Sequence, residues 1–295
     1  MASKDHYYVP DHSVWPLVAT VGLFTLLAST GTIMINYTAG KPSSTAWFFL
    51  IVAIGLMVFM LFGWFGRVVK ESRARLYNEQ VDKSFRWGMS WFIFSEVMFF
   101  LAFFGALFYV REFALPWLSG HGGRADTALL WPHFTYNWPL LKNPDPQLFQ
   151  GPKSGVDAWG IAFFNTILLV TSSVTVTIAH KCLKSNNRRG LTVWLALTIV
   201  LGMTFLGCQA YEYHHVYTAL GMNLGAGIYS TTFFMLTGFH GLHVTIGAIT
   251  LTVMLVRVLR GHFSPDYHFG FEAASWYWHF VDVVWICLFV FVYIL

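Results

Sequence analysis

Seven long apolar stretches, separated by shorter polar ones, dominate the chain. Each is about 20 residues or more, the length that a helix needs to cross a hydrocarbon layer about 30 Å thick. The runs are unbroken and do not alternate between apolar and polar positions, so they exclude a β-barrel. The expected spans are residues 15–36, 46–65, 87–109, 158–180, 191–211, 228–258 and 271–295. The pattern predicts an all-α membrane protein in which residues 1–295 form a single seven-helix transmembrane domain.

The composition agrees with a membrane protein. Hydrophobic residues make up 56% of the chain and charged residues 11%, whereas about 25% of the residues of a soluble protein are charged. The first residues lack a basic segment followed at once by an apolar core and a cleavage site, so we expect the first span to be retained. Cys182, Cys208 and Cys287 lie far apart, which argues against a disulfide framework, a zinc ribbon or a thiolate copper site.

Basic residues gather on one side of the predicted membrane. Six Lys or Arg lie within residues 67–86, between the second and third spans. Together with the N-terminal tail and the connections after the fourth and sixth spans, this side holds 13 of the 18 Lys and Arg residues. The positive-inside rule then predicts a cytoplasmic N-terminus and a C-terminus outside. A basic patch between spans is typical of a topology signal with anionic-lipid contacts, so we expect no nucleic-acid partner.

One carboxylate, Glu96, interrupts the third predicted span. It lies nine residues after Trp87, which places it about 13.5 Å deep and near the midplane of the bilayer. An ionised carboxylate there costs at least about 2.5–3.5 kcal/mol, so Glu96 should be protonated, face other helices or touch a polar cavity. Two interpretations stay open: a functional acid, or an acid held by a hydrogen bond in a helix contact.

Histidines and acids in later spans raise the question of a metal centre. Glu212 and His215 form a single E-x-x-H motif, whereas a di-iron carboxylate bundle needs that motif from two helices and two further glutamates. His240 and His243 share one helix face and could be haem ligands if another helix supplied a facing histidine. We interpret this pair as a structural hydrogen-bond node and expect no bound metal.

A second set of polar residues lies in the seventh span. Glu272, His279 and Asp282 share one face of the predicted helix, where acids and imidazoles can satisfy each other or relay protons. Together with His240 and His243, they form the predicted polar seam. The sequence contains no nucleophile–base pair and no phosphate-binding glycine loop, so we expect no catalytic residue in this chain. A proton-handling complex, a transporter or a lipid-binding subunit could each use such a bundle.

Four stretches of the sequence resemble one known family, subunit III of the haem-copper cytochrome c oxidases. They are RWGMSWFIFSEVMFF at residues 86–100, QAYEY at 209–213, STTFFMLTGFHGLHVTIG at 230–247 and HFGFEAASWYWHFVDVVW at 268–285. The likeness covers most of the chain and is weakest in the connection 111–157. Glu96 matches the buried acid of the family.

The resemblance implies a bundle split into 2 + 5 helices by a V-shaped cleft that holds phospholipid. It also implies a non-catalytic, non-redox subunit of a proton-pumping cytochrome c oxidase in aerobic respiration. Haems and copper would belong to the partner subunits I and II, and cytochrome c would meet the complex only through subunit II. This chain would support proton uptake and the stability of catalytic subunit I, in what we expect to be a bacterial inner membrane.

The resemblance also places certain residues near bound lipid. These residues are Trp64, Phe65, Glu71, Arg257 and His262. Many relatives carry two adjacent tryptophans where this chain has Trp64 and Phe65. The phenylalanine keeps an aromatic cleft wall but lacks an indole N–H, so the resemblance does not carry over a lipid hydrogen bond to residue 65.

Three alternatives stay open at this point. The chain could be the matching subunit of a quinol-oxidising relative, although seven spans favour cytochrome c as the donor. It could be a haem-binding membrane cytochrome that uses His240, His243 and His279, in which case the isolated chain would show a Soret band. It could also be a stand-alone transporter, which would be active without partners. The absence of a clear internal repeat weakens this last alternative.

Overall fold

The computed structural model describes residues 7–9, 12–121 and 125–295, and all regular secondary structure within these ranges is helical. Seven helical segments in them are long and apolar enough to cross a membrane, which confirms the predicted all-α, seven-helix class. The segments are Trp15–Thr38, Ser44–Arg73, Glu79–Leu118, Ala158–Lys184, Arg188–Thr218, Ile228–Leu259 and Phe269–Ile294. The chain divides into two compact units, Met1–Phe85 and Arg86–Leu295.

Several helices continue beyond the predicted spans. Helices α2 (Ser44–Arg73) and α3 (Glu79–Tyr109) extend into the basic connection, because hydropathy marks the part of a helix that lies in lipid and not its end. The third segment also passes its predicted end through a π-helical turn, Val110–Ala114, and the short α4 (Leu115–Leu118). Helix α5 (Ala125–Leu130) forms in the long connection that follows.

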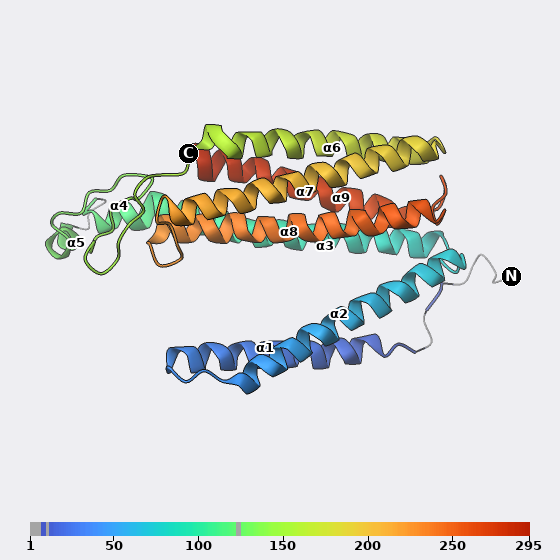
Figure 1. Cartoon of the computed structure of the whole chain (residues 1–295), viewed down its shortest axis with the longest axis horizontal. Coiled ribbons are helices and arrows are strands. Elements are labelled where there is room, and N and C mark those ends of the chain that lie inside the picture. The colour runs from blue at the N-terminus through green and yellow to red at the C-terminus, as the bar shows by residue number, and fades with distance from the viewer. Residues whose placement is uncertain (1–6, 10–11, 122–124) are drawn as a thin grey trace. The chain divides into compact units, whose positions relative to one another are not determined.

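The first unit contains a helical hairpin. Helix α1 (Trp15–Thr38) packs against α2, and a short connection joins them, so the two helices are antiparallel neighbours (Figure 1). Ser43 caps α2 by accepting a 3.3 Å hydrogen bond from the backbone N–H of Ala46. Gly22 of α1 faces Met57, and a Cβ at this glycine would lie 2.9 Å from the methionine sulfur. The hairpin therefore uses a small residue at a point where the two helices come close.

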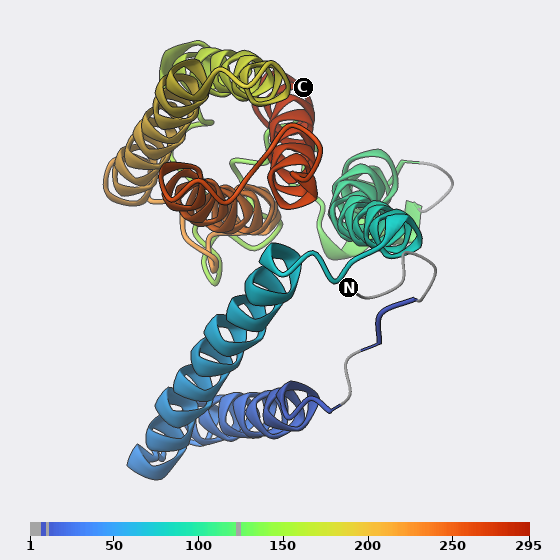
Figure 2. The same cartoon turned by 90° about the vertical axis from the view of Figure 1, so that its right-hand side faces the viewer.

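Four helices of the second unit form a closed ring in which each packs against two neighbours. They are α6 (Phe163–Lys184), α7 (Arg188–Thr218), α8 (Ile228–Leu259) and α9 (Phe269–Leu288), with π-helical turns at Ala158–Ala162 and Phe289–Ile294. The order around the ring is the order along the chain, and α9 returns to pack against α6. Figure 1 shows the four helices from the side, and Figure 2 shows them almost end-on.

Trp278 of α9 lies fully buried in this ring. Its indole N–H donates a 2.9 Å hydrogen bond to the hydroxyl of Ser172 on α6. A Cβ at Gly202 on α7 would lie 2.6 Å from Cη2 of the indole, and one at Gly247 on α8 would lie 2.8 Å from Cε3. Two glycines on neighbouring helices thus make the space for one large side chain.

The connection before α6 is anchored to the ring by Asn143. Its side-chain amide donates to the carbonyl of Phe149 at 2.9 Å and to that of Ala226 at 3.2 Å. Gly227, which follows, has φ of 110°, and a Cβ there would lie 2.4 Å from Oδ1 of Asn143. Only glycine fits both the backbone angle and the contact, so this position sets where the connection meets the start of α8.

Candidate functional site

Glu96 of α3 contacts His243 of α8. Its Oε2 lies 2.9 Å from Nε2 of the imidazole, and the two side chains are 22% and 11% exposed. Aromatic rings surround the histidine: the ring of Phe100 is 5.0 Å from it, that of Phe99 6.0 Å and that of Tyr277 6.4 Å. The carboxylate that interrupts the third span is therefore held between helices in an otherwise apolar setting.

The hydrogen bonds of His243 define how many protons this pair holds. Nδ1 lies 2.6 Å from the carbonyl oxygen of Phe239, which can only accept, so Nδ1 carries a proton. The contact between Nε2 and Glu96 then contains one further proton, on either the imidazole or the carboxyl group. Both forms have zero net charge, which is the least costly state for a partly buried acid and imidazole in a membrane. Both ring nitrogens of His243 are engaged, so neither is available as an iron ligand in this arrangement.

His240, one turn away on α8, is 1% exposed and faces α9. Its Nε2–H donates to the carbonyl of Val281 at 3.2 Å, and its ring lies 5.1 Å from that of Trp285. Its Nδ1 is buried and makes no hydrogen bond within the described part of the chain. The two histidines of the predicted node therefore join α8 to different helices, one to α3 and the other to α9.

Of the other predicted seam residues, His279 finds its partners on another helix, whereas Asp282 forms no hydrogen bond within the described ranges. The hydroxyl of Thr177 donates to its own helix, so it accepts from Nε2–H of His279 at 3.3 Å. Nδ1 of the same ring then accepts from Ser173 at 2.7 Å, which ties α9 to α6. Asp282 is 4% exposed, and neither carboxyl oxygen has a hydrogen-bond partner among the described residues.

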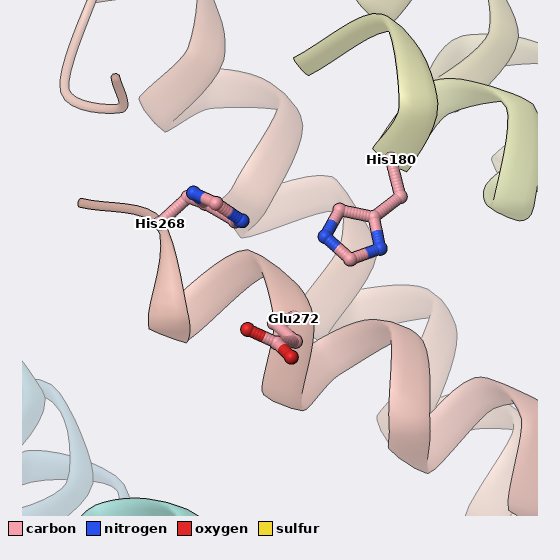
Figure 3. Close-up of side chains that lie close together, drawn as sticks. All are labelled: His180, His268 and Glu272. Atoms are coloured by element: carbon pink, nitrogen blue, oxygen red, sulfur yellow. The ribbon is translucent and has the colours of Figure 1, made fainter. Parts of the chain in front are cut away.

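Glu272 lies in the first turn of α9, where a helix N-terminus favours a negative charge. It forms a 2.8 Å ion pair with Arg86, whose guanidinium lies 5.3 Å from the ring of Phe269. His180 from the end of α6 and His268 directly before α9 lie beside the same carboxylate. One donor atom from each of the three side chains lies within 4.8 Å of the other two. Figure 3 shows the imidazoles and the carboxylate gathered around a common space.

Glu212, near the other end of the ring, is almost fully buried and accepts two hydrogen bonds. Nε2 of Gln209 donates to Oε2 at 3.1 Å, and the hydroxyl of Tyr293 donates to the same oxygen at 2.9 Å. Asn165 extends the cluster through a 3.5 Å hydrogen bond to Oε1 of Gln209. The cluster connects the second half of α7 with the start of α6 and the last turn of the chain.

Within the first unit, the predicted lipid-contacting residues form an exposed aromatic surface and an internal ion pair. The rings of Trp64 and Phe65 stack 5.4 Å apart at an interplanar angle of 16°, and both side chains are exposed. Glu71 accepts from Nε of Arg67 and from the hydroxyl of Tyr77, each at 2.9 Å. Burial, and then the hydrogen bond to Glu71, raise the pKa of Tyr77 above its ordinary value, so the phenol remains a donor.

Within the second unit, Arg257 lies partly buried at the end of α8. Its guanidinium is 4.3 Å from the ring of Phe263, and Nη1 lies 3.7 Å from the sulfur of Met254. Its Nε is buried without a hydrogen-bond partner among the residues that the structure describes. The backbone N–H of His262 donates to the Arg257 carbonyl at 3.0 Å, which brings both predicted lipid residues to one end of the helix. A cation held on an aromatic face is suited to a phosphate group.

Four members of these sites are not predicted from the sequence: Arg86, His180, His268 and Tyr293. Only one local signal was available for them, the four-residue spacing of His268 and Glu272 at the start of a predicted helix, which places both on one face. The other contacts join residues from separate helices. Their pairing depends on how the helices are rotated against each other, which helical periodicity alone does not define.

The seven apolar helices and the polar contacts between them define an integral membrane protein of the polytopic helical class. The sequence profile of the family described as Cytochrome c oxidase subunit III matches residues 5–115 and 150–295. Apart from residues 1–4, the unmatched residues are 116–149, which lie in the long connection before the fourth span, where the resemblance is weakest.

Individual relatives match over nearly their whole length. The chain is 35% identical over 296 residues to Cytochrome c oxidase subunit 3 of Marchantia polymorpha, covering 99% of this chain and 97% of the relative. It is 37% identical over 294 residues to the protein of that name from Lumbricus terrestris, with 98% of each chain covered. It is 36% identical over 302 residues to the one from Struthio camelus, covering 99% and 98%. The chain belongs to the cytochrome c oxidase subunit III family, whose named members are subunits of an oxidoreductase complex.

Proposed function

We propose that this chain is the non-redox subunit III of a proton-pumping cytochrome c oxidase, where it binds phospholipid, supports proton uptake and stabilises catalytic subunit I. Its partners are subunits I and II, which carry the haems and copper, and cytochrome c reaches the complex through subunit II. The observation that carries the proposal is the Glu96–His243 pair, in which a carboxyl group and an imidazole share a hydrogen bond inside the predicted spans. Membership of the family supports the rest of the assignment.

The pair can support proton uptake because its shared proton moves between carboxyl and imidazole without creating net charge. The geometry is compatible with both interpretations of Glu96. The same hydrogen bond to His243 can serve as a contact between helices and can place an ionisable acid where it exchanges a proton. A variant that distinguishes a helix contact from a functional acid must keep the hydrogen bond to His243 but lack a group that can exchange a proton.

Glu96→Gln makes this separation. The amide can donate to Nε2 of His243 with Nδ1 still bonded to Phe239, so we expect the stability of the chain to change by less than about 1 kcal/mol and the complex to assemble. The amide cannot exchange the proton, so proton uptake during turnover should slow by about twofold or more. Assembly is measured by co-purification with subunits I and II, and uptake by pH changes in oxidase vesicles during turnover.

His243→Leu serves as the comparison variant because it leaves Glu96 without its partner. We expect it to destabilise the chain by about 1–3 kcal/mol, since a partly buried polar group then loses its hydrogen bond. If Glu96→Gln assembles normally and proton uptake is unchanged, the acid is a helix contact only and the functional interpretation is wrong.

The lipid part of the proposal rests on Arg257 and its aromatic support. Arg257→Ala should reduce the phospholipid that stays bound to the purified complex by about one molecule, because the guanidinium is a favourable partner for a headgroup phosphate. Lipid content is measured by mass spectrometry of extracted complex. Lys153→Ala removes one cation from an exposed loop position and serves as the control. Equal lipid content in the two variants would count against the assignment of Arg257.

The V-shaped lipid cleft and the orientation with a cytoplasmic N-terminus belong to the same proposal. The concentration of Lys and Arg on one side of the predicted spans supports the orientation. The bacterial inner membrane stays a prediction, because the three relatives named above come from a plant and two animals.

A further inference from the structure

The end of the ring where α6 stops and α9 begins carries two histidines and a carboxylate from separate parts of the sequence. We propose that His180, His268 and Glu272 bind a divalent transition ion of the zinc class. One donor atom from each residue already lies within 4.8 Å of the other two, and all three residues are partly buried. The side chains face a common space, as Figure 3 shows.

The hydrogen bonding of the imidazoles leaves donor atoms for an ion. Nε2 of His180 is buried and has no hydrogen-bond partner among the residues described. A buried nitrogen without a partner is costly because it has lost its hydrogen bond to water, and a bound ion would offset that cost. The rings lie 5.4 Å apart and are inclined at 64°, so they do not stack and can turn their edges toward the same point.

The donor set matches the chemistry of zinc. Two imidazole nitrogens and one carboxylate oxygen, with solvent in the fourth position, form a tetrahedral site with bonds of about 2.0–2.2 Å. Donors in such a site lie roughly 3.3 Å apart, a separation that rotation of the two imidazoles can reach. The ion would connect the end of α6 to the start of α9.

Arg86 is the charged group that opposes this ion. It forms a 2.8 Å ion pair with Oε1 of Glu272, so an ion must bind through Oε2 or share the carboxylate with the guanidinium. A hydrogen-bonded outer partner can orient a ligating carboxylate, but its positive charge repels the ion. The structure therefore predicts that Arg86 lowers the affinity of the site.

Zinc binding to the full-length chain in detergent tests the proposal. The chain is stripped with a chelator and equilibrated with zinc, and bound zinc is measured by elemental mass spectrometry and by competition with a zinc-sensitive dye. We expect His180→Gln and His268→Gln each to remove one equivalent of tightly bound zinc or to weaken it at least tenfold. His215→Gln, an exposed histidine at the other end of the ring, is the matched control and should leave that equivalent in place.

Two further measurements distinguish an ion site from a structural cluster. Zinc should raise the Tm of the wild-type chain but not that of His268→Gln, and Arg86→Gln should tighten zinc binding severalfold by removing the repulsive charge. A purely structural role for Glu272 and Arg86 predicts neither effect. Equal zinc binding by the wild type and a His180→Gln, His268→Gln double variant, or weaker binding by Arg86→Gln than by the wild type, would overturn the proposal.

Discussion

Replacing Trp278 with alanine should lower the free energy of unfolding of the chain by about 3–5 kcal/mol. The indole is fully buried, donates a hydrogen bond to Ser172 and fills the space left by Gly202 and Gly247. Its removal leaves a cavity, which the surrounding helices could fill only by shifting closer to one another. The loss is measured by unfolding in increasing mole fractions of sodium dodecyl sulfate, followed by circular dichroism.

Trp91→Ala is the matched control for this prediction. This tryptophan is 64% exposed, so its removal creates no cavity in the chain and should change the stability by less than about 0.5 kcal/mol in the same assay. Equal losses for the two variants would mean that the ring does not depend on the packing of Trp278.

A comparably large effect is expected for Glu212→Ala. The substitution leaves the buried hydroxyl of Tyr293 and the amide of Gln209 without their acceptor, and we expect a loss of about 2–4 kcal/mol. The effect should appear in the same unfolding assay, and also as faster hydrogen exchange at the end of the chain, which Tyr293 connects to α7.

Glu212→Gln tests the cause of this loss. The glutamine keeps a carbonyl oxygen that can accept from both donors, so its cost should stay below about 1 kcal/mol. Tyr293→Phe removes one donor instead and should cost an intermediate amount. If the glutamine variant is as unstable as the alanine variant, the acceptor role of Glu212 is not what stabilises the cluster.

The helices could be predicted from the sequence because their apolar length is a property of single segments. Their ends could not, since α2 and α3 continue into water-exposed, charged residues that still have good helix propensity. Glu96 was identified as an unusual residue from its depth alone. Its partner could not be identified, because His243 lies on a helix whose rotation against α3 depends on the packing of aromatic side chains around the pair.

The predicted seam shows the same limit. Glu272, His279 and Asp282 do share a helix face, but periodicity says only which side of α9 they occupy. The neighbours opposite that face decide their chemistry: Arg86 and His180 for Glu272, and Ser173 for His279. Asp282 shows that a shared face does not guarantee a partner.

Most apolar side chains of the α1–α2 hairpin are exposed. Only 11% of the apolar window of each of its helices is buried, compared with 61% for the last helical segment. Side chains such as Phe62 and Phe48 are left for acyl chains or other proteins to cover. We therefore expect this hairpin to be the part of the chain most exposed to membrane proteases whenever neither lipid nor another protein covers it.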